Sequence, residues 1–395
     1  MATPSAGQSI APVRVDGRQL AVRRRRERSE LRDRIPRYLA GDPFLQRLWD
    51  EIHAAGQLKA ITVDLTHVCQ LRCEGCYFFI ESMDESKAPK DERVFDEFVA
   101  AEKARGTNYI TVLGGEPSLQ LDRLKKLHEN FYLLTVTNGL RKIPWKGFEN
   151  MPIAISVWGD HEIDTQLRGR GKIDVFARAL KHYKDDPRAG WYFTASAGNA
   201  HIIESVVSEC VANGNYVYFN YYEDNADIGG EFDHRQGFGE VRREIDRMID
   251  LYPESIVSTS YLNKVCTTSE LFGQRWGFDV CATVSTNHEK NQPRFRNGNP
   301  WNPHFRAYLP DLQNVRRCCV GEARDCDKCY NANARHTWVL INRDQHLRTK
   351  QDFTNWLTSA YIFYLTARAI PWEEGVKLLP EIHERTRAAR DTATV

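Results

Sequence analysis

Between residues 58 and 222, short apolar runs alternate with segments that have the hydrophobic spacing of amphipathic helices. The apolar runs are AITVDLTHV, YITVLGG, FYLLTVTNG, PIAISVWG, WYFTASAG and YVYFNYY. They are rich in β-branched and aromatic residues, which is typical of buried strands. Between most of them lie segments such as DERVFDEFVAAEKARG and KIDVFARALKHY, whose apolar residues recur every three or four positions. Strands that alternate with helices predict a parallel sheet with helical crossovers, either open or curled into a barrel.

The same patterns divide the chain into four parts. These are a basic, partly disordered leader (1–40), an N-terminal helix (41–57), the alternating region (58–230) and a C-terminal extension (231–395). In the N-terminal helix, Asp42 is the predicted cap and Pro43 stands in the first turn. The extension holds a cysteine-rich segment, residues 266–330, with little helical periodicity, and ends in two predicted closing helices.

Composition and charge narrow the class of protein. The chain of 395 residues carries 54 Lys and Arg against 53 Asp and Glu, a net charge of +1, which argues against a nucleic-acid-binding or membrane-surface protein. No apolar stretch is long enough to span a bilayer and the N-terminus lacks the layout of a secretory signal, so we expect a cytoplasmic protein. Ten cysteines in a reducing compartment indicate metal binding or redox chemistry more than disulfides. The sequence gives no indication of the oligomeric state.

Three of the ten cysteines lie in the eight residues CQLRCEGC, directly after the first predicted strand. Cys69, Cys73 and Cys76 can hold three corners of an iron–sulfur cube and leave the fourth iron open to another ligand. Ligands of parallel α/β sheets bind beyond the carboxyl ends of the strands, which is where this loop lies. A structural zinc site is the alternative, and it needs a fourth ligand such as His67.

This loop, with the aromatic Tyr77 directly after its last cysteine, resembles the signature of the radical S-adenosylmethionine (SAM) superfamily. The resemblance covers about residues 58–225. It implies a partial (β/α)6 barrel of the TIM type, and a [4Fe-4S] cluster whose open iron chelates SAM. The reduced cluster would cleave SAM to a 5′-deoxyadenosyl radical that abstracts hydrogen from a substrate. An electron donor such as flavodoxin or ferredoxin is the partner that this chemistry implies.

Further motifs of the family occur in order at the ends of the following strands. LGGEPSL, after the second strand, contains Gly114, Gly115 and Glu116. Its glycines permit a close backbone approach to a ligand, and the Glu116 carboxylate can accept hydrogen bonds from the SAM ammonium group. The segment TVTNG, which ends at Gly139, closes the third strand, as the family often shows.

Four more residues are candidate SAM contacts by their similarity to the family pattern. Ser156 ends the fourth strand, where the family commonly has a hydroxyl. Arg168, in QLRGRGKIDVF, is the candidate partner of the SAM carboxylate, because guanidinium groups bind carboxylates bidentately; a surface salt bridge is its alternative role. Ser196 and Asn199 follow the fifth strand and are weaker candidates of the same kind.

A second group of cysteines lies in the extension and resembles the auxiliary-cluster regions, SPASM and twitch domains, of many radical SAM enzymes. The candidate ligands are Cys281, Cys319, Cys326 and Cys329. The match is partial, so a second [4Fe-4S] cluster, a structural zinc site and free thiols all stay open. Because Cys318 and Cys319 are adjacent, one sulfur is spare, and Cys319 is a candidate hydrogen donor to a substrate radical as well as a candidate ligand. Cys210, inside a helical pattern, is expected to be an inert buried thiol.

The aromatic strand YVYFNYYED is the candidate substrate wall. Tyr218, Asn220, Tyr222 and Asp224 share one face, whereas Phe219 and Tyr221 face the core. We expect a small polar metabolite such as a sugar or nucleoside, with Tyr222 as a candidate catalytic residue. Oxidation, epimerisation, dehydration and decarboxylation are all compatible with hydrogen abstraction. A peptide is the alternative substrate, which would make the protein a peptide-modifying enzyme. A non-catalytic iron–sulfur or zinc-binding module is the alternative in which the protein is not an enzyme.

Overall fold

The computed structural model describes residues 27–222, 238–299, 301–322 and 325–387. Its centre is one sheet in which six parallel strands follow each other in chain order. They are β1 (Ala60–Asp64), β2 (Tyr109–Leu113), β3 (Tyr132–Thr137), β4 (Ile153–Val157), β5 (Ala189–Ala195) and β6 (Tyr216–Tyr221). The prediction of a parallel α/β sheet with a partial TIM-like arrangement is therefore confirmed.

The extension also contributes to this sheet, which the sequence pattern did not predict. Strand β9 (Ala307–Tyr308) pairs in parallel with β1, and β10 (Val315–Arg316) pairs antiparallel with β9. The sheet thus has eight strands in the order β10-β9-β1-β2-β3-β4-β5-β6. A separate hairpin is formed by β7 (Glu270–Leu271) and β8 (Gln274–Arg275).

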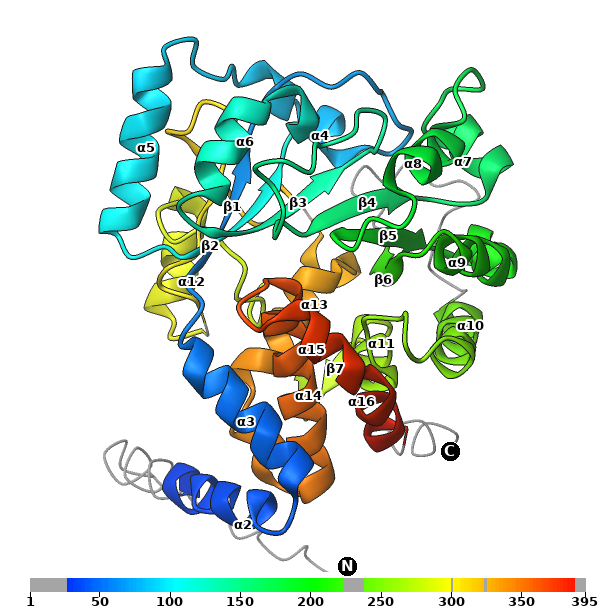
Figure 1. The fold of residues 1–395 in the computed structure, drawn as a ribbon. Coiled ribbons are helices and arrows are strands. Elements are labelled where there is room, and N and C mark those ends of the chain that lie inside the picture. Colours follow the sequence, from blue (N-terminus) through cyan, green and yellow to red (C-terminus); the bar gives the residue numbers. More distant parts are fainter. Residues whose placement is uncertain (1–26, 223–237, 300, 323–324, 388–395) are drawn as a thin grey trace, which may run out of the picture.

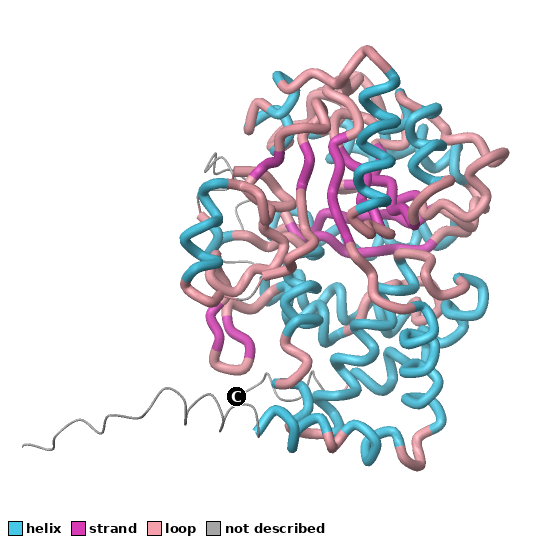
Figure 2. The backbone as a smooth tube through the Cα atoms, turned by 90° about the vertical axis from the view of Figure 1, so that its left-hand side faces the viewer, coloured by secondary structure: helices cyan, strands magenta, loops and turns pink. Residues whose placement is uncertain are grey.

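Helices cover both faces of the sheet (Figure 1). One set comprises α4 (Tyr77–Ile80), α5 (Glu92–Ala104), α6 (Leu121–His128), α7 (His161–Leu167), α8 (Val175–Tyr183), α9 (Ile203–Ala212) and α10 (Phe238–Leu251). The other set comprises α11 (Ser260–Cys266), α13 (Ala332–Ile341), α14 (Lys350–Thr366), α15 (Trp372–Gly375) and α16 (Leu379–Thr386), with α12 (Gln292–Arg296) in the cysteine-rich segment. Helix α3 (Pro43–Ala55) packs on α14, and α2 (Ile35–Leu39) packs on α3, both away from the strands. Figure 2 shows the strands of the large sheet in the upper half of the molecule, and most of the second set of helices below them.

Local sequence explains where these helices begin. The Asp42 carboxylate accepts a hydrogen bond from the Leu45 amide at the start of α3, which confirms the predicted cap. Asp174 caps α8 in the same way. The predicted leader falls outside the described residues up to residue 26, and its last part includes α2. Among the helices of the described ranges, none is long and apolar enough to cross a membrane.

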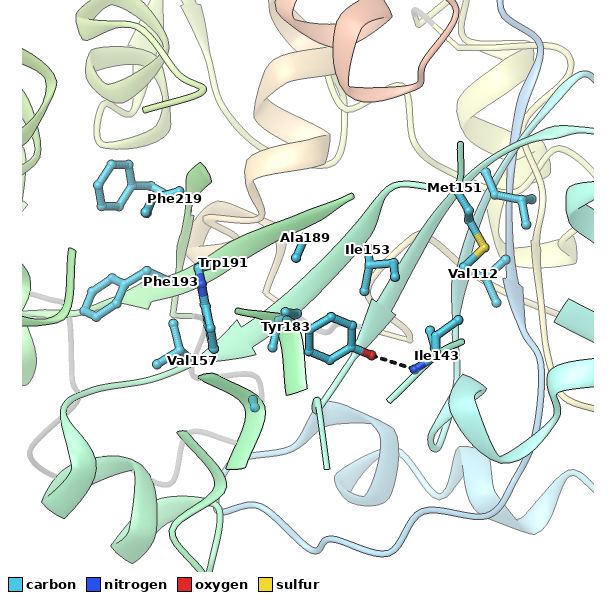
Figure 3. Close-up of a cluster of buried hydrophobic side chains, with 14 of the residues drawn as sticks. Val112, Ile143, Met151, Ile153, Val157, Tyr183, Ala189, Trp191, Phe193 and Phe219 are labelled. Atoms are coloured by element: carbon cyan, nitrogen blue, oxygen red, sulfur yellow. Dashed lines mark hydrogen bonds between the residues drawn. The ribbon is translucent and has the colours of Figure 1, made fainter. Parts of the chain in front are cut away.

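Alternation along the strands gives the sheet two different faces. In β5, Trp191 and Phe193 point to the helices of the first set and lie in the main hydrophobic core (Figure 3). In the same core the amide of Ile143 donates a hydrogen bond to the Tyr183 hydroxyl at 3.0 Å. Thr194, on the other face of β5, lines a cavity instead. The face that carries this cavity is the one covered by α13 and α14.

Candidate active site

A large cavity, with a volume of about 330 Å³, lies between the sheet, the loop that carries the first three cysteines, and helices α13 and α14. We call residues 69–76 the three-cysteine loop. It follows β1, and its cysteines Cys69, Cys73 and Cys76 all line the cavity together with Tyr77. The sequence prediction that these thiols face a ligand-sized space beyond the strand ends therefore agrees with the structure.

Tyr222 packs against the three-cysteine loop at Gly75. Gly75 has φ +67°, and a Cβ there would lie 2.6 Å from the hydroxyl oxygen of Tyr222, so this position requires glycine. Tyr222 in turn packs edge to face against Trp158, with ring centroids 5.9 Å apart. Tyr222, the sequence-predicted catalytic candidate, thus lines the cavity and contacts the loop directly.

The glycines after β2 bring two loops together. Gly114 has φ +111°, and a Cβ at Gly115 would lie 2.2 Å from the carbonyl oxygen of Val68. The Gly115 amide donates to the Thr66 carbonyl at 2.8 Å, and the Glu116 amide donates to the Val68 carbonyl at 2.9 Å. The glycines thus let the backbone after β2 lie close to the residues just before Cys69. Both glycines also line the cavity.

Glu116 is buried and joins the ends of β2 and β3. Its Oε1 accepts from the Ser118 amide at 2.9 Å and from the Thr137 hydroxyl at 2.6 Å, and its Oε2 accepts from the Asn138 amide at 2.8 Å. A carboxylate has about four acceptor sites, so three protein donors leave about one site, on Oε2. This carboxylate is held in one orientation at the edge of the cavity.

Arg168 is also buried and lies beside Cys73. Its Nη1 donates to the Ser156 carbonyl at 2.6 Å and forms an ion pair with Asp164, at 3.0 Å to Oδ1. Burial lowers the pKa of Arg168, but the neighbouring Asp164 carboxylate and the Cys73 thiol outweigh it and leave the pKa raised. The alternative of a surface salt bridge is wrong, because both partners of the ion pair are almost completely buried.

Ser196 and Asn199 are buried and lie outside the set of residues that line the cavity. The Ser196 amide donates to Asn199 Oδ1 at 2.7 Å, and the Asn199 amide donates to the Ser196 hydroxyl at 3.3 Å. This reciprocal arrangement is a capping box at the start of the 3-10 helix Ala197–Ile202. The structure therefore gives both residues a structural role and does not bring them to the other candidates.

The donor set of the three-cysteine loop fits an iron–sulfur cluster. Burial raises the pKa of the Cys69 thiol to about 12 and that of Cys76 to about 11, and burial also raises the pKa of Cys73 against the effect of Arg168. Such thiols lose their protons only beside a strong positive charge, which the iron ions of a cluster would supply. In the described part of the chain, no three His, Cys, Asp or Glu side chains are close enough together to hold a single metal ion. The three thiols therefore surround a space and do not converge on one position.

Residues 60–160 match a family described as a 4Fe-4S single cluster domain. This span runs from β1 through the three-cysteine loop and the glycine motif to just beyond β4. This match supports a [4Fe-4S] cluster held by the three-cysteine loop. The matched span contains the motifs by which the sequence resembles the radical SAM superfamily, and SAM is the second cofactor that this resemblance implies. No curated protein sequence matches this chain significantly.

Solved structures give a more distant likeness. The structure of SuiB from Streptococcus suis with S-adenosylmethionine is 16% identical, with a TM-score of 0.38, over 49% of this chain and 48% of SuiB. The chain thus spans about half the length of SuiB. The structure of anSMEcpe with AdoMet and a Cp18Cys peptide is 14% identical, with a TM-score of 0.47, over 82% of this chain and 99% of that one.

Cys266, on α11, lines the large cavity, whereas the other five cysteines of the extension gather at a second, much smaller cavity. Three separate segments supply them: Cys281, the adjacent Cys318 and Cys319, and the Cys326 and Cys329 pair. The Thr283 hydroxyl lies 3.2 Å from the sulfurs of both Cys281 and Cys319. All four predicted auxiliary ligands thus line one space, and Cys318, which the sequence treats as part of a spare pair, lines it too. Cys210, in contrast, is buried in α9, as expected.

Cys318 and Cys319 differ in their surroundings. Burial raises the pKa of Cys318 to about 12, with the nearby Cys281 thiol as the next cause and Cys326 among the others. Cys319 instead lines both the small cavity and the large one, and its sulfur also approaches Asn331 Oδ1 at 3.7 Å. Cys319 therefore stands between the cysteine group and the substrate space.

The predicted substrate wall is largely as the alternation indicated. Tyr218 and Asn220, with Tyr222, line the cavity, whereas Phe219 and Tyr221 also lie in the main core. Asp224 lies outside the described residues.

Several of the site residues that were not predicted come from the extension. Asn331, Asn333 and His336 reach the cavity from α13 and its start. Arg316, on β10, lies with its guanidinium 5.9 Å from the Tyr77 ring and forms a buried ion pair with Asp64 at 2.9 Å. Local patterns around these residues carry no signal of the site, because the contacts depend on how the extension folds back onto β1.

Proposed function

We propose that this protein is a radical SAM enzyme that abstracts hydrogen from a small polar metabolite held in the large cavity. One observation carries the proposal: the three-cysteine loop and a wall of tyrosine, threonine and asparagine side chains border the same 330 Å³ space. Cys69, Cys73 and Cys76 would hold a cluster whose one-electron reduction of SAM would supply a 5′-deoxyadenosyl radical and release methionine. A substrate lying against the wall would then be within reach of the cofactors without leaving the cavity.

The chain's own residues position the cofactor. The free acceptor site of Glu116 binds the SAM ammonium group, and its three protein donors fix the direction of that bond. Arg168 Nη2 lies 3.5 Å from the Asn138 carbonyl oxygen, a distance at which a hydrogen bond is weak, so this nitrogen can turn to the SAM carboxylate. Ser156 and Tyr77 border the same space, and Tyr222 shields the loop from the substrate side.

The second cysteine group supports a further metal site. Two thiols from one turn, Cys326 and Cys329, together with Cys281 and Cys318, offer four sulfur ligands around one small cavity. Cys319 then remains directed to the substrate space, where it can serve as a hydrogen donor or as a contact. A second [4Fe-4S] cluster there favours oxidation, because it can accept the substrate electron, whereas free thiols favour epimerisation.

Modification of a peptide side chain is the second candidate function. The same aromatic and hydroxyl-lined wall would accept the side chain of a peptide residue. An electron donor of the flavodoxin or ferredoxin type and a cytoplasmic location stay predictions of the same proposal.

The test begins with anaerobic reconstitution, and iron, sulfide and dithionite-driven 5′-deoxyadenosine formation are measured. We expect the Cys69/Cys73/Cys76→Ala variant to lose about four irons per chain and all SAM cleavage. A Cys210→Ala variant is the matched control and should keep both. An iron content that is unchanged in the triple variant, or wild-type protein that never cleaves SAM, would contradict the proposal.

A further inference from the structure

The large cavity has a charged end and an uncharged end. In the described part of the chain, the charged residues that line it are Glu116 and Arg168. Both belong to the end at the three-cysteine loop, and both already have protein partners. The other end is lined by Tyr109, Thr111, Tyr192, Tyr218, Asn333 and Thr366, with His336. Tyr109 opens β2 and Glu116 follows its end, so the two ends are on the order of 15 Å apart along the strand.

His336 at the uncharged end has one nitrogen fixed by the protein. Its Nε2 lies 2.7 Å from the carbonyl oxygen of Ser359 on α14. A carbonyl only accepts, so Nε2 carries the proton and donates it. The ring also packs edge to face on Phe363, with centroids 5.5 Å apart, and Phe363 packs in the same way on Tyr109 at 5.8 Å. These contacts fix both the tautomer and the orientation of the ring.

The second nitrogen of His336 is therefore a fixed acceptor. Nδ1 has no hydrogen-bond partner among the described residues and is not among the side-chain atoms sealed from solvent, so it is reachable from the cavity. Burial lowers the pKa of His336 to about 4, which keeps the ring neutral and the Nδ1 lone pair available. The neighbouring hydroxyls can rotate to donate or accept, but this nitrogen can only accept.

We infer that His336 Nδ1 receives the hydrogen bond of an uncharged substrate group that carries an O–H or N–H donor, such as a hydroxyl, phenol or amide. The inference rests on the proposed function, because it names the chemistry of the substrate part that enters this cavity. A carboxylate or phosphate would meet the acceptor lone pair, and because no cationic side chain of the described residues lines this end of the cavity, its desolvation would be uncompensated. A group of the same shape without a donor would leave the buried nitrogen unpaired.

Three small aromatic probes of similar size separate these cases. Phenol is neutral and has a donor, anisole is neutral and has none, and benzoate is an anion. Their binding to the SAM-loaded, reconstituted protein is measured by calorimetry, and [15N]histidine spectra report on His336. We expect phenol to bind about fivefold to tenfold more tightly than anisole, the effect of one neutral hydrogen bond, and to shift the Nδ1 resonance, while benzoate shows no binding.

Two variants link that preference to the residue. His336→Phe keeps a ring but removes the acceptor and should abolish the preference for phenol over anisole. His336→Gln keeps a donor for Ser359 and an acceptor for the ligand and should retain it, whereas Thr366→Ala is a control at the same end of the cavity and should also retain it. Equal binding of phenol and anisole, binding of benzoate, an unchanged preference in His336→Phe, or no binding of any probe would overturn the inference. SAM cleavage by the wild-type protein is measured separately, so a failure of the proposed function is visible independently of the probe result.

Discussion

The two cysteine groups of this protein are built in opposite ways. Cys69, Cys73 and Cys76 come from one short loop, and the residues just before that loop are held by backbone bonds to the glycine motif after the neighbouring strand β2. Five of the six cysteines of the extension come from three segments that meet at the second cavity. The first group is a local feature placed on a regular sheet, whereas the second exists only after the extension has folded. A short motif can therefore specify the first, but the second depends on tertiary structure.

The same contrast holds for the polar groups around the two sites. Glu116 and Arg168 lie at the ends of elements of the barrel and are bonded to neighbours on adjacent strands and loops. Arg316 belongs to the extension, yet it is buried against Asp64 of β1 and close to Tyr77. The extension thus does more than cover the barrel, because it places a buried charge between the three-cysteine loop and the second cysteine group.

The largest expected effect comes from testing whether the second group binds metal as the first does. We expect Cys326/Cys329→Ala to lose about four of about eight irons per chain after reconstitution. Cys318→Ala should lose the same amount, and Cys319→Ala should keep all of it, since Cys319 borders the substrate cavity. Iron and sulfide analysis with electron paramagnetic resonance measures this.

The opposite pattern would revise the ligand set. Loss of iron in Cys319→Ala with retention in Cys318→Ala would return Cys319 to the set that the sequence suggested. About four irons in the wild type, unaffected by any of these changes, would show that the second group does not hold a cluster.

A smaller effect tests how the two regions are joined. Arg316 and Asp64 are buried, and their nearest N···O distance is 2.9 Å, although both carboxylate oxygens fall outside hydrogen-bond geometry, so the contact is mainly ionic. Burial raises the pKa of Asp64 to about 6 against the effect of Arg316. Because Arg316→Met leaves this carboxylate without its cation, we expect it to lower the free energy of unfolding by about 3–5 kcal/mol. Urea denaturation measures the change.

Two controls distinguish the ion pair from general damage. Asp64→Leu with Arg316→Met should recover most of the loss, because replacement of both buried charges by apolar groups is often neutral. Arg93→Met removes an exposed partner of Asp91 and should leave the urea midpoint unchanged, because exposed ion pairs contribute little to stability. An Arg316→Met protein as stable as the wild type would show that the two regions do not depend on this pair.

Much of the barrel was predictable because its signals are local. The six parallel strands follow from β-branched and aromatic runs, and the Asp42 cap follows from the residues next to it. Strands β9 and β10 were missed because two residues are too few for a period to show. Helix α13 was missed although it contributes residues to the cavity.

The residues of the candidate site also fall into those that local sequence predicts and those whose roles depend on tertiary contacts. The three-cysteine loop and the glycine motif were found because their spacing is the signal. Ser196 and Asn199 were chosen for their place after a strand, yet a serine followed three residues later by asparagine also suits a capping box, which is what forms. His336 was missed because its role depends on Ser359 and Phe363, which lie on another helix.

The smallest effect concerns a surface contact inside the barrel region. His161 lies 2.9 Å from Asp174 and 3.0 Å from Glu209. Burial lowers its pKa, but hydrogen bonds to Glu209 and Asp174 outweigh burial and leave the pKa raised. A raised folded-state pKa means that the stabilisation is fully present below the unfolded-state pKa of about 6.5 and is lost as pH rises through the folded-state value. Because His161 is 43% exposed, solvent weakens the effect, and we expect His161→Gln to cost about 0.3–0.5 kcal/mol at pH 5.5 and less at pH 8.5. Urea denaturation at the two pH values measures this change in stability. A loss that is larger at pH 8.5 would contradict a protonated His161 and would mean that the contact is a hydrogen bond of the neutral ring.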